Sequence, residues 1–257
     1  GITYSYFADQ IKFDMSKGFP LLTTKKMAIK AIIHELLFFI KGKTNTKELE
    51  AANVNIWKGN TSREFLDNMG FYVYDEGEMG PMYGYQWRNF NGESYDQLKN
   101  ILQSIKSDPF SRRHIMTSFN PLQAELGVLY PCHSIVIQFY VEEDNFISLH
   151  MYQRSADVFL GLPFNIASMS LFLALICAHL SDDTIIYKPK NMVISLGDIH
   201  LYETHMEQAL EQLIRVPLKP CNLRVLGKKE NIEDYTIDDF EINEYIHYPP
   251  IKAAMVA

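Results

Sequence analysis

The longest stretches in which apolar residues recur with a helical spacing predict helices. Residues 27–41 carry apolar side chains every three to four positions, which gives one broad apolar face, and Gly42 follows as a stop signal. Residues 95–107 show the same period over a narrower face. Residues 165–180 predict a central helix buried in the core, because the apolar run at 169–180 is too short to span a bilayer. Shorter helices are expected over 46–53 and 202–215.

Shorter runs of alternating or β-branched residues predict strands. Two of these runs, at residues 3–7 and 10–14, open the chain and predict a pair of neighbouring strands. Between residues 57 and 79 the chain is polar and contains several glycines, which predicts an inserted segment of helix and loop. The remaining strands are expected at 114–119, 134–141, 146–154, 192–196 and 239–246.

This order of elements predicts an α+β fold with one large mixed sheet and helices on one of its sides. A chain of 257 residues can bury a large core, and no Pro-, Gly- or Ser-rich linker or repeat divides it. We therefore expect a single domain over residues 1–257. The other face of the sheet is left without helices, so it needs a different cover.

Composition narrows the class of protein. The net charge is −7, and the acidic residues are spread along the chain, which disfavours nucleic acid as the main partner. Cys132, Cys177 and Cys221 are an odd number without paired spacing, which favours a reducing compartment such as the cytoplasm. The first residues show no signal peptide.

Cys132 is the first candidate for chemistry. It lies in Pro131-Cys132-His133, directly before the strand expected at 134–141. A reactive thiol needs a lowered pKa, which a nearby cation or helix N-terminus can provide. Arg112-Arg113 and the segment 153–157 are plausible sources of that cation. By residue type alone, however, a free cysteine is more often a buried structural residue.

Other candidates also have a plain structural interpretation. The helical pattern alone places Glu35 on an exposed face, and the adjacent Arg112 and Arg113 are typical of a solvated surface, although two guanidinium groups could also bind a phosphate. The aromatic, glycine-rich segment 80–88 is suited to lining a cleft with Tyr83, although such clusters more often belong to the core. Asn165 could simply be the N-cap of the helix that follows it.

Several familiar motifs fail at a required position. His34-Glu35 begins like a zinc-protease H-E-x-x-H motif, but Phe38 occupies the place of the second histidine. Gly42-Lys43-Thr44 lacks the first glycine of a P-loop. His200 and His205 have no carboxylate at ligand spacing, so a metal site is not expected. The sequence also lacks a G-x-G-x-x-G motif for a nicotinamide or flavin cofactor.

Several longer blocks, which follow one another along essentially the whole chain, resemble thymidylate synthases. They are Gly18–Lys26, His34–Leu37, Gly80–Arg88, Ser111–Arg113, Pro131–His133, Gln153–Asp157, Leu160–Ser168, Leu196–Tyr202 and the tail Ile251–Ala257. Blocks of this length in one order are far more specific than any single motif.

The resemblance implies the reductive methylation of dUMP to dTMP with 5,10-methylenetetrahydrofolate, which leaves as dihydrofolate. Carbon C5 of uracil is barely nucleophilic, and addition of the Cys132 thiolate at C6 turns it into an enolate-like carbon. The catalytic residues that the resemblance implies are Cys132, Glu35, Tyr83, Asn165, Asp157 and Arg154. Glu35 would act through a water, and Tyr83 would assist removal of the C5 proton.

The resemblance also implies the binding residues. Those for the nucleotide are Arg112, Arg113, His133, Gln153, Arg154, Ser155, Ala156, Asp157, Asn165, His200 and Tyr202. Those for the folate are Asp157, Trp57, Lys25, Ala28, Gly161 and Val256. It further implies a homodimer that packs sheet face to sheet face, with Arg112 and Arg113 reaching the partner's site. The family's N-terminal arginine loop is absent here, and a fused dihydrofolate reductase domain is expected in some members.

Some positions depart from the family pattern. Lys58 replaces an aspartate, Phe119 a tryptophan, and Tyr130 a smaller residue before Pro131. Ala28 replaces a histidine found in some members, and Ala253-Ala254 replace Met-Glu in the tail. These changes concern folate binding and tail closure. Two alternatives remain open: a deoxycytidylate hydroxymethylase, which would carry aspartate in place of Asn165, and a non-catalytic nucleotide- or folate-binding member.

Overall fold

The computed structural model describes residues 1–256, so Ala257, at the end of the family-like tail, lies outside the described residues. Its main sheet has five strands in the order β1-β5-β4-β3-β2. Strands β4 and β5 pair in parallel and the other pairs are antiparallel, which gives the mixed sheet that was expected. The strands are β1 (Thr3–Asp14), β2 (Ile115–Thr117), β3 (Val136–Val141), β4 (Phe146–Asp157) and β5 (Lys188–Tyr202).

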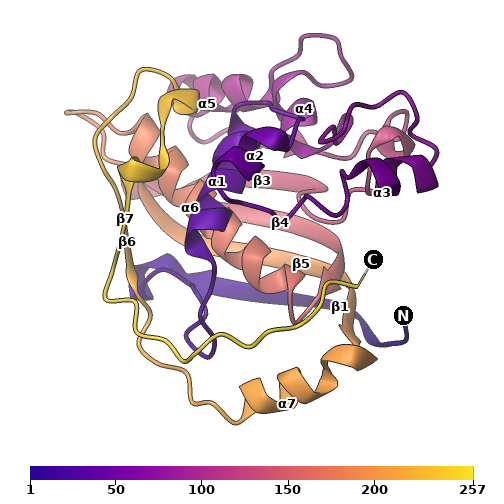
Figure 1. Cartoon of the computed structure of the whole chain (residues 1–257). Helices are drawn as coiled ribbons and strands as arrows, with labels where there is room; N and C mark the ends of the chain where they lie inside the picture. The colour runs from indigo at the N-terminus through magenta and orange to yellow at the C-terminus, as the bar shows by residue number, and fades with distance from the viewer. Residues whose placement is uncertain (257) are drawn as a thin grey trace.

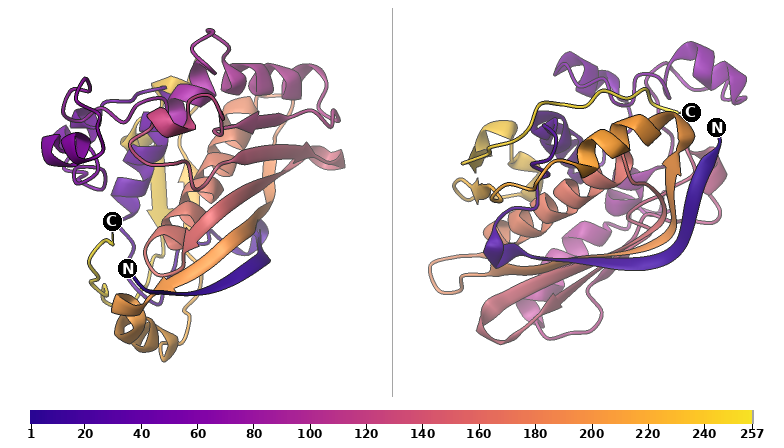
Figure 2. Two further views of the ribbon diagram at one scale, coloured as in Figure 1. Left: turned by 90° about the vertical axis from the view of Figure 1, so that its right-hand side faces the viewer. Right: turned by 90° about the horizontal axis from the view of Figure 1, so that it is seen from below.

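Helices pack over one face of this sheet (Figures 1 and 2). Helix α6 lies directly on strands β4 and β5, and α1 packs against α6. The helices are α1 (Ile29–Ile40), α2 (Lys47–Ala51), α3 (Arg63–Asn68), α4 (Tyr83–Arg88), α5 (Gln97–Ser107), α6 (Gly161–Leu180) and α7 (Met206–Leu213). A separate two-stranded sheet consists of β6 (Asn222–Val225) and β7 (Phe240–Asn243).

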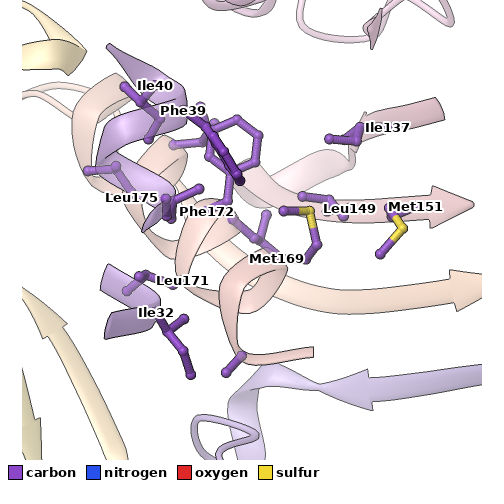
Figure 3. Packing of buried hydrophobic residues seen from close by; sticks show 14 of the residues in the cluster. Ile32, Phe39, Ile40, Ile137, Leu149, Met151, Met169, Leu171, Phe172 and Leu175 are labelled. Atoms are coloured by element: carbon purple, nitrogen blue, oxygen red, sulfur yellow. The ribbon is translucent and has the colours of Figure 1, made fainter. Parts of the chain in front are cut away.

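The core lies between α6, α1 and the inner face of the sheet. Met169 and Phe172 of α6 point toward Leu149 on β4, while Phe39 approaches from α1 (Figure 3). Phe172 also stacks on Trp87, with ring centroids 5.2 Å apart, and this contact joins α4 to the same core. Removing such side chains from water is the main stabilising term of the fold, and it fixes the ends of β4 and α6, where the candidate residues lie.

The structure corrects four expectations about elements. The first two runs form one strand, β1, rather than a pair, because the chain continues through Ala8 (φ 65°) along β5 without turning back. Strand β5 is three times as long as the run at 192–196 that predicted it. Strand β6 was not predicted, because its alternating run is only four residues long. Helix α6 begins at Gly161, so it is long enough to cross a membrane, although 78% of its most apolar window is buried inside the protein.

The outer face of the sheet has no helix over it within the described residues. Along β4, Leu149 and Met151 are buried, whereas His150 and Tyr152 between and beyond them are exposed. The Ser195 hydroxyl on β5 lies 2.9 Å from Gln10 Nε2 on β1 and 2.8 Å from His150 Nε2 on β4. The packing of this face in a homodimer stays a prediction.

Candidate active site

Cys132 lies in the segment before β3, beside the C-terminal end of β4, and Arg154 of β4 holds this segment in place. The amide of Arg154 donates to the Cys132 carbonyl over 2.9 Å. The Arg154 side chain donates from Nε to the Pro131 carbonyl (2.6 Å) and from Nη2 to the Tyr130 carbonyl (3.0 Å). Its guanidinium carbon also lies 4.9 Å from the centre of the Tyr130 ring. One arginine therefore fixes the whole segment before the thiol.

Tyr83 packs beside the thiol. Its buried phenol oxygen lies 3.5 Å from Cys132 Sγ and accepts a hydrogen bond from the Cys132 amide over 3.3 Å. The ring stacks on His133 with centroids 4.2 Å apart. Tyr83 opens α4, and the next residue must be small, because a Cβ on Gly84 would lie 2.6 Å from the Phe39 carbonyl oxygen.

Burial controls the charges around this pair. It lowers the pKa of His133 to about 4, so this imidazole is neutral at neutral pH. It also raises the pKa of the Cys132 thiol, and the Tyr83 hydrogen bond and the Arg154 charge offset only part of that rise. A lowered thiol pKa was expected from the nearby cation, but desolvation of the thiolate is the larger effect here. In the absence of ligand the cysteine is therefore a protonated thiol.

Glu35 differs from its pattern-based expectation. The helical pattern placed it on an exposed face, yet its side chain is half-buried and Oε1 accepts a hydrogen bond from Trp57 Nε1 over 2.7 Å. Desolvation raises the pKa of Glu35 to about 7, against the smaller opposing effect of the Trp57 bond. A carboxyl group with this pKa can both give and take a proton at neutral pH.

A cavity of about 400 Å³ joins these groups. The predicted residues that line it are Glu35, Trp57, Tyr83, Cys132, His133, Asp157, Gly161 and Asn165. The lining residues that sequence reasoning missed are Ile56, Asn60, Leu129, Leu160, Phe164, Ala253 and Met255. Most of the missed residues are apolar, and only their closeness along the chain to Trp57, Cys132, Gly161 or Val256 could have suggested them.

The junction between β4 and α6 holds two of the polar lining residues. The Asp157 carboxylate accepts the amides of Phe159 (2.9 Å) and Leu160 (3.2 Å), which shapes the turn into the helix. Asn165 is 9% exposed and lies inside α6, not at its N-cap, because the helix begins at Gly161. The interpretation of Asn165 as a helix cap is therefore wrong, and its amide is available to the cavity.

The residues expected to bind the nucleotide's phosphate and sugar lie at the ends of neighbouring strands. Buried Gln153 donates to the Ser155 carbonyl over 3.0 Å, and Ala156 is fully buried. His200 on β5 pairs with Asp157 on β4. Its Nδ1 lies 2.8 Å from Asp198 Oδ1, and the Tyr202 ring packs edge-on against its imidazole. The exposed pair Arg112 and Arg113, in contrast, precedes the edge strand β2 and does not line the cavity.

The remaining residues expected at the folate site lie outside the cavity lining. Lys25 is buried, donates to the Phe159 carbonyl and lies 3.6 Å from the centre of the Phe159 ring; burial lowers its pKa to about 8. Ala28 is exposed just before α1, and Val256 follows Met255, which lines the cavity. Among the described residues, no group of three or more His, Cys, Asp or Glu side chains could hold a metal ion.

Comparison with known proteins agrees with the site. The sequence profile of the family described as Thymidylate synthase matches residues 1–257. The chain is 45% identical to thymidylate synthase of Mycoplasma pneumoniae over 263 residues, which cover 96% of this chain and 88% of the relative. It is 43% identical to human thymidylate synthase, over 98% of this chain and 82% of the relative.

A longer relative shows the same match over part of its length. The chain is 40% identical to a protein of Arabidopsis thaliana named bifunctional dihydrofolate reductase-thymidylate synthase 1, over 98% of this chain and 50% of that protein. The family match over residues 1–257 includes the cysteine segment, the cavity lining and the tail. On this evidence the chain belongs to the thymidylate synthase family.

Proposed function

We propose that this protein is a thymidylate synthase, which converts dUMP to dTMP and uses 5,10-methylenetetrahydrofolate as the source of the methylene group and the hydride. The observation that carries the proposal is the Cys132 thiol beside Tyr83, in one cavity with Glu35 and Asn165. A thiol nucleophile, an amide and two proton-transfer groups are what the chemistry at the uracil ring needs.

Each side chain has a role that follows from its surroundings. Cys132 adds to C6 of the uracil ring as a thiolate, and the Tyr83 hydrogen bond and the Arg154 charge favour this ionised form against desolvation. Asn165 offers a donor to the O4 oxygen and an acceptor to N3–H. Glu35 exchanges protons at the O4 side, and the Tyr83 oxygen assists removal of the proton from C5.

The nucleotide's phosphate needs several cations. Arg154 and Ser155 lie at the end of β4 near Cys132, and we assign them to the phosphate. Arg112 and Arg113 are exposed in the single chain, which is compatible with donation to the site of a second subunit. His200 and Tyr202, at the end of β5, are assigned to the ribose.

The folate is assigned to the outer part of the same cavity. Trp57 offers a flat apolar surface, Asp157 a carboxylate, and Gly161 an open approach beside the start of α6. Lys25 and Ala28 would bind the folate only at the margin of this cavity, and Val256 would close over it. In this proposal the protein is a cytoplasmic homodimer without nucleic acid or membrane as a partner, and a fused dihydrofolate reductase domain would match one of its relatives.

The test is turnover by the purified protein. With dUMP and methylenetetrahydrofolate, dTMP and dihydrofolate should form in equal amounts, and dCMP should be a poor substrate. Formation of a hydroxymethylated pyrimidine, or of tetrahydrofolate instead of dihydrofolate, would instead support the hydroxymethylase. Binding of dUMP without any turnover would support the non-catalytic alternative.

A further inference from the structure

The C-terminal tail reaches the cavity with almost no hydrogen bonds of its own. Residues 247–256 form neither helix nor strand, yet Ala253 and Met255 line the cavity. The tail is tied down earlier, where the Tyr248 amide donates to Thr23 and Arg215 donates to the Pro249 carbonyl. Within the described residues 250–256 a single hydrogen bond remains, between His205 Nε2 and the Ala254 carbonyl over 2.7 Å.

His205 is fixed in place. It is 1% exposed and immediately precedes α7. Its ring lies against Phe159 (centroids 5.7 Å apart) and edge-on to Tyr202 (5.6 Å). Because its partner is a carbonyl, Nε2 must carry the hydrogen, and Nδ1 finds no partner among the described residues. The imidazole is therefore a rigid donor that points at the tail.

The position of His205 links the tail to both parts of the proposed site. Tyr202 belongs to the end of β5, where the ribose is assigned, and Phe159 follows Asp157 at the end of β4. Ala254 lies between two residues that line the cavity, so losing its one bond would free both of them.

We propose that His205 is a positioning residue that holds the C-terminal tail closed over the folate part of the cavity. It does not line the cavity and acts through the Ala254 carbonyl. The inference rests on the proposed function for the identity of the ligand under the tail. The contact between His205 and the tail can be tested without any ligand.

The test compares His205→Phe, which keeps a ring and removes the donor, with His205→Gln, whose amide nitrogen can take the place of Nε2. Loss of one hydrogen bond is expected to raise amide exchange in residues 250–256 by about 3- to 10-fold in His205→Phe. The folate KM should rise by a similar factor, while the Kd of dUMP alone stays within about twofold. His205→Gln should restore most of both effects.

His179 provides a matched control. It is also a buried histidine whose Nδ1 lacks a partner within residues 1–256, but it lies at the end of α6 beside Tyr235. His179→Phe should leave tail exchange and folate KM unchanged.

Unchanged tail exchange in His205→Phe would overturn the inference, and so would equal losses of dUMP and folate binding together with a lowered Tm. Failure of the wild type to turn over dUMP would overturn the proposed function instead, while the exchange measurement would still report on the tail.

Discussion

The phenol oxygen of Tyr83 lies 3.5 Å from the sulfur of Cys132 and accepts that residue's own amide hydrogen. This pair joins the first turn of α4 to the segment before β3, two parts of the chain about fifty residues apart. The phenol can therefore both orient the thiol and take part in proton transfer beside it.

The first prediction concerns the nucleophile. Cys132→Ser should abolish turnover and covalent capture by 5-fluoro-dUMP, because a serine hydroxyl is far less ionised than a thiol. The fold should persist, since the change is nearly isosteric. Capture is read by mass spectrometry of the denatured protein, with Cys177→Ser as a control that retains adduct formation. An adduct on the Cys132→Ser protein would remove this residue from its role.

The second prediction concerns Glu35 and pH. Its pKa is about 7 in the folded protein against 4.5 when unfolded, so between these values the folded state holds a proton that the unfolded state has lost. This group's contribution to stability is thus fully present below pH 4.5 and is lost as pH rises to about 7, by at most about 3 kcal/mol.

In the Glu35→Gln variant this side chain cannot ionise, so the stability of the variant should not fall in this way as pH rises. Denaturant unfolding of both proteins at pH 5, 6, 7 and 8 gives the difference, which should grow in favour of Glu35→Gln as pH rises. Parallel curves for the two proteins would show that Glu35 is solvated in the folded state. The variant should also lose most of its turnover, because it cannot transfer a proton.

Part of this site could be predicted from the sequence, and part could not. The run Pro131-Cys132-His133 before a strand placed the thiol correctly, because both proline and the strand are local signals. The pattern-based prediction that Glu35 is exposed was wrong, because its burial depends on Trp57, which lies on a separate segment. The helix period carries no information about that partner, and the same holds for apolar lining residues such as Phe164.

The third prediction concerns Tyr130. Among the positions that depart from the family pattern, it is the nearest along the chain to Cys132. Its ring faces the Arg154 guanidinium and lies 5.8 Å from the Phe119 ring. A cation–π contact at a partly exposed site contributes about 0.5–1 kcal/mol, so Tyr130→Ala should raise the KM for dUMP by about 2- to 5-fold. Tyr130→Phe keeps the ring and is the control. If both variants match the wild type, the two backbone bonds to Arg154 are enough to hold it.

The fourth prediction tests the donation of arginines between subunits. An Arg113→Ala chain and a Cys132→Ser chain should each be inactive alone. In a mixed dimer, one site then carries both defects and the other carries neither. Equal mixing should restore about a quarter of the wild-type activity, because half of the dimers are mixed and each has one intact site. Subunit exchange is followed with an affinity tag on one chain. Exchange without rescue would mean that Arg113 serves its own chain or no site.

The last prediction concerns Asn165, which lines the cavity from inside α6 and which we propose selects the pyrimidine. An amide oriented for uracil donates to O4 and accepts from N3–H, whereas cytosine reverses both groups, with an amino donor and an unprotonated N3 acceptor, so an amide that keeps the uracil orientation leaves polar groups unpaired. A buried polar group left without a partner costs about 1–3 kcal/mol, or roughly one to two orders of magnitude in specificity.

The wild-type protein should therefore prefer dUMP over dCMP, and Asn165→Asp should move the preference toward dCMP. The aspartate can accept from the 4-amino group and, when protonated, donate to N3. The measurement is kcat/KM for both nucleotides in both proteins, with Asn60→Asp as a control for added charge in the same cavity. Equal or better use of dCMP by the wild type would contradict the synthase assignment. An unchanged ratio in Asn165→Asp would instead place pyrimidine choice in the surrounding main chain.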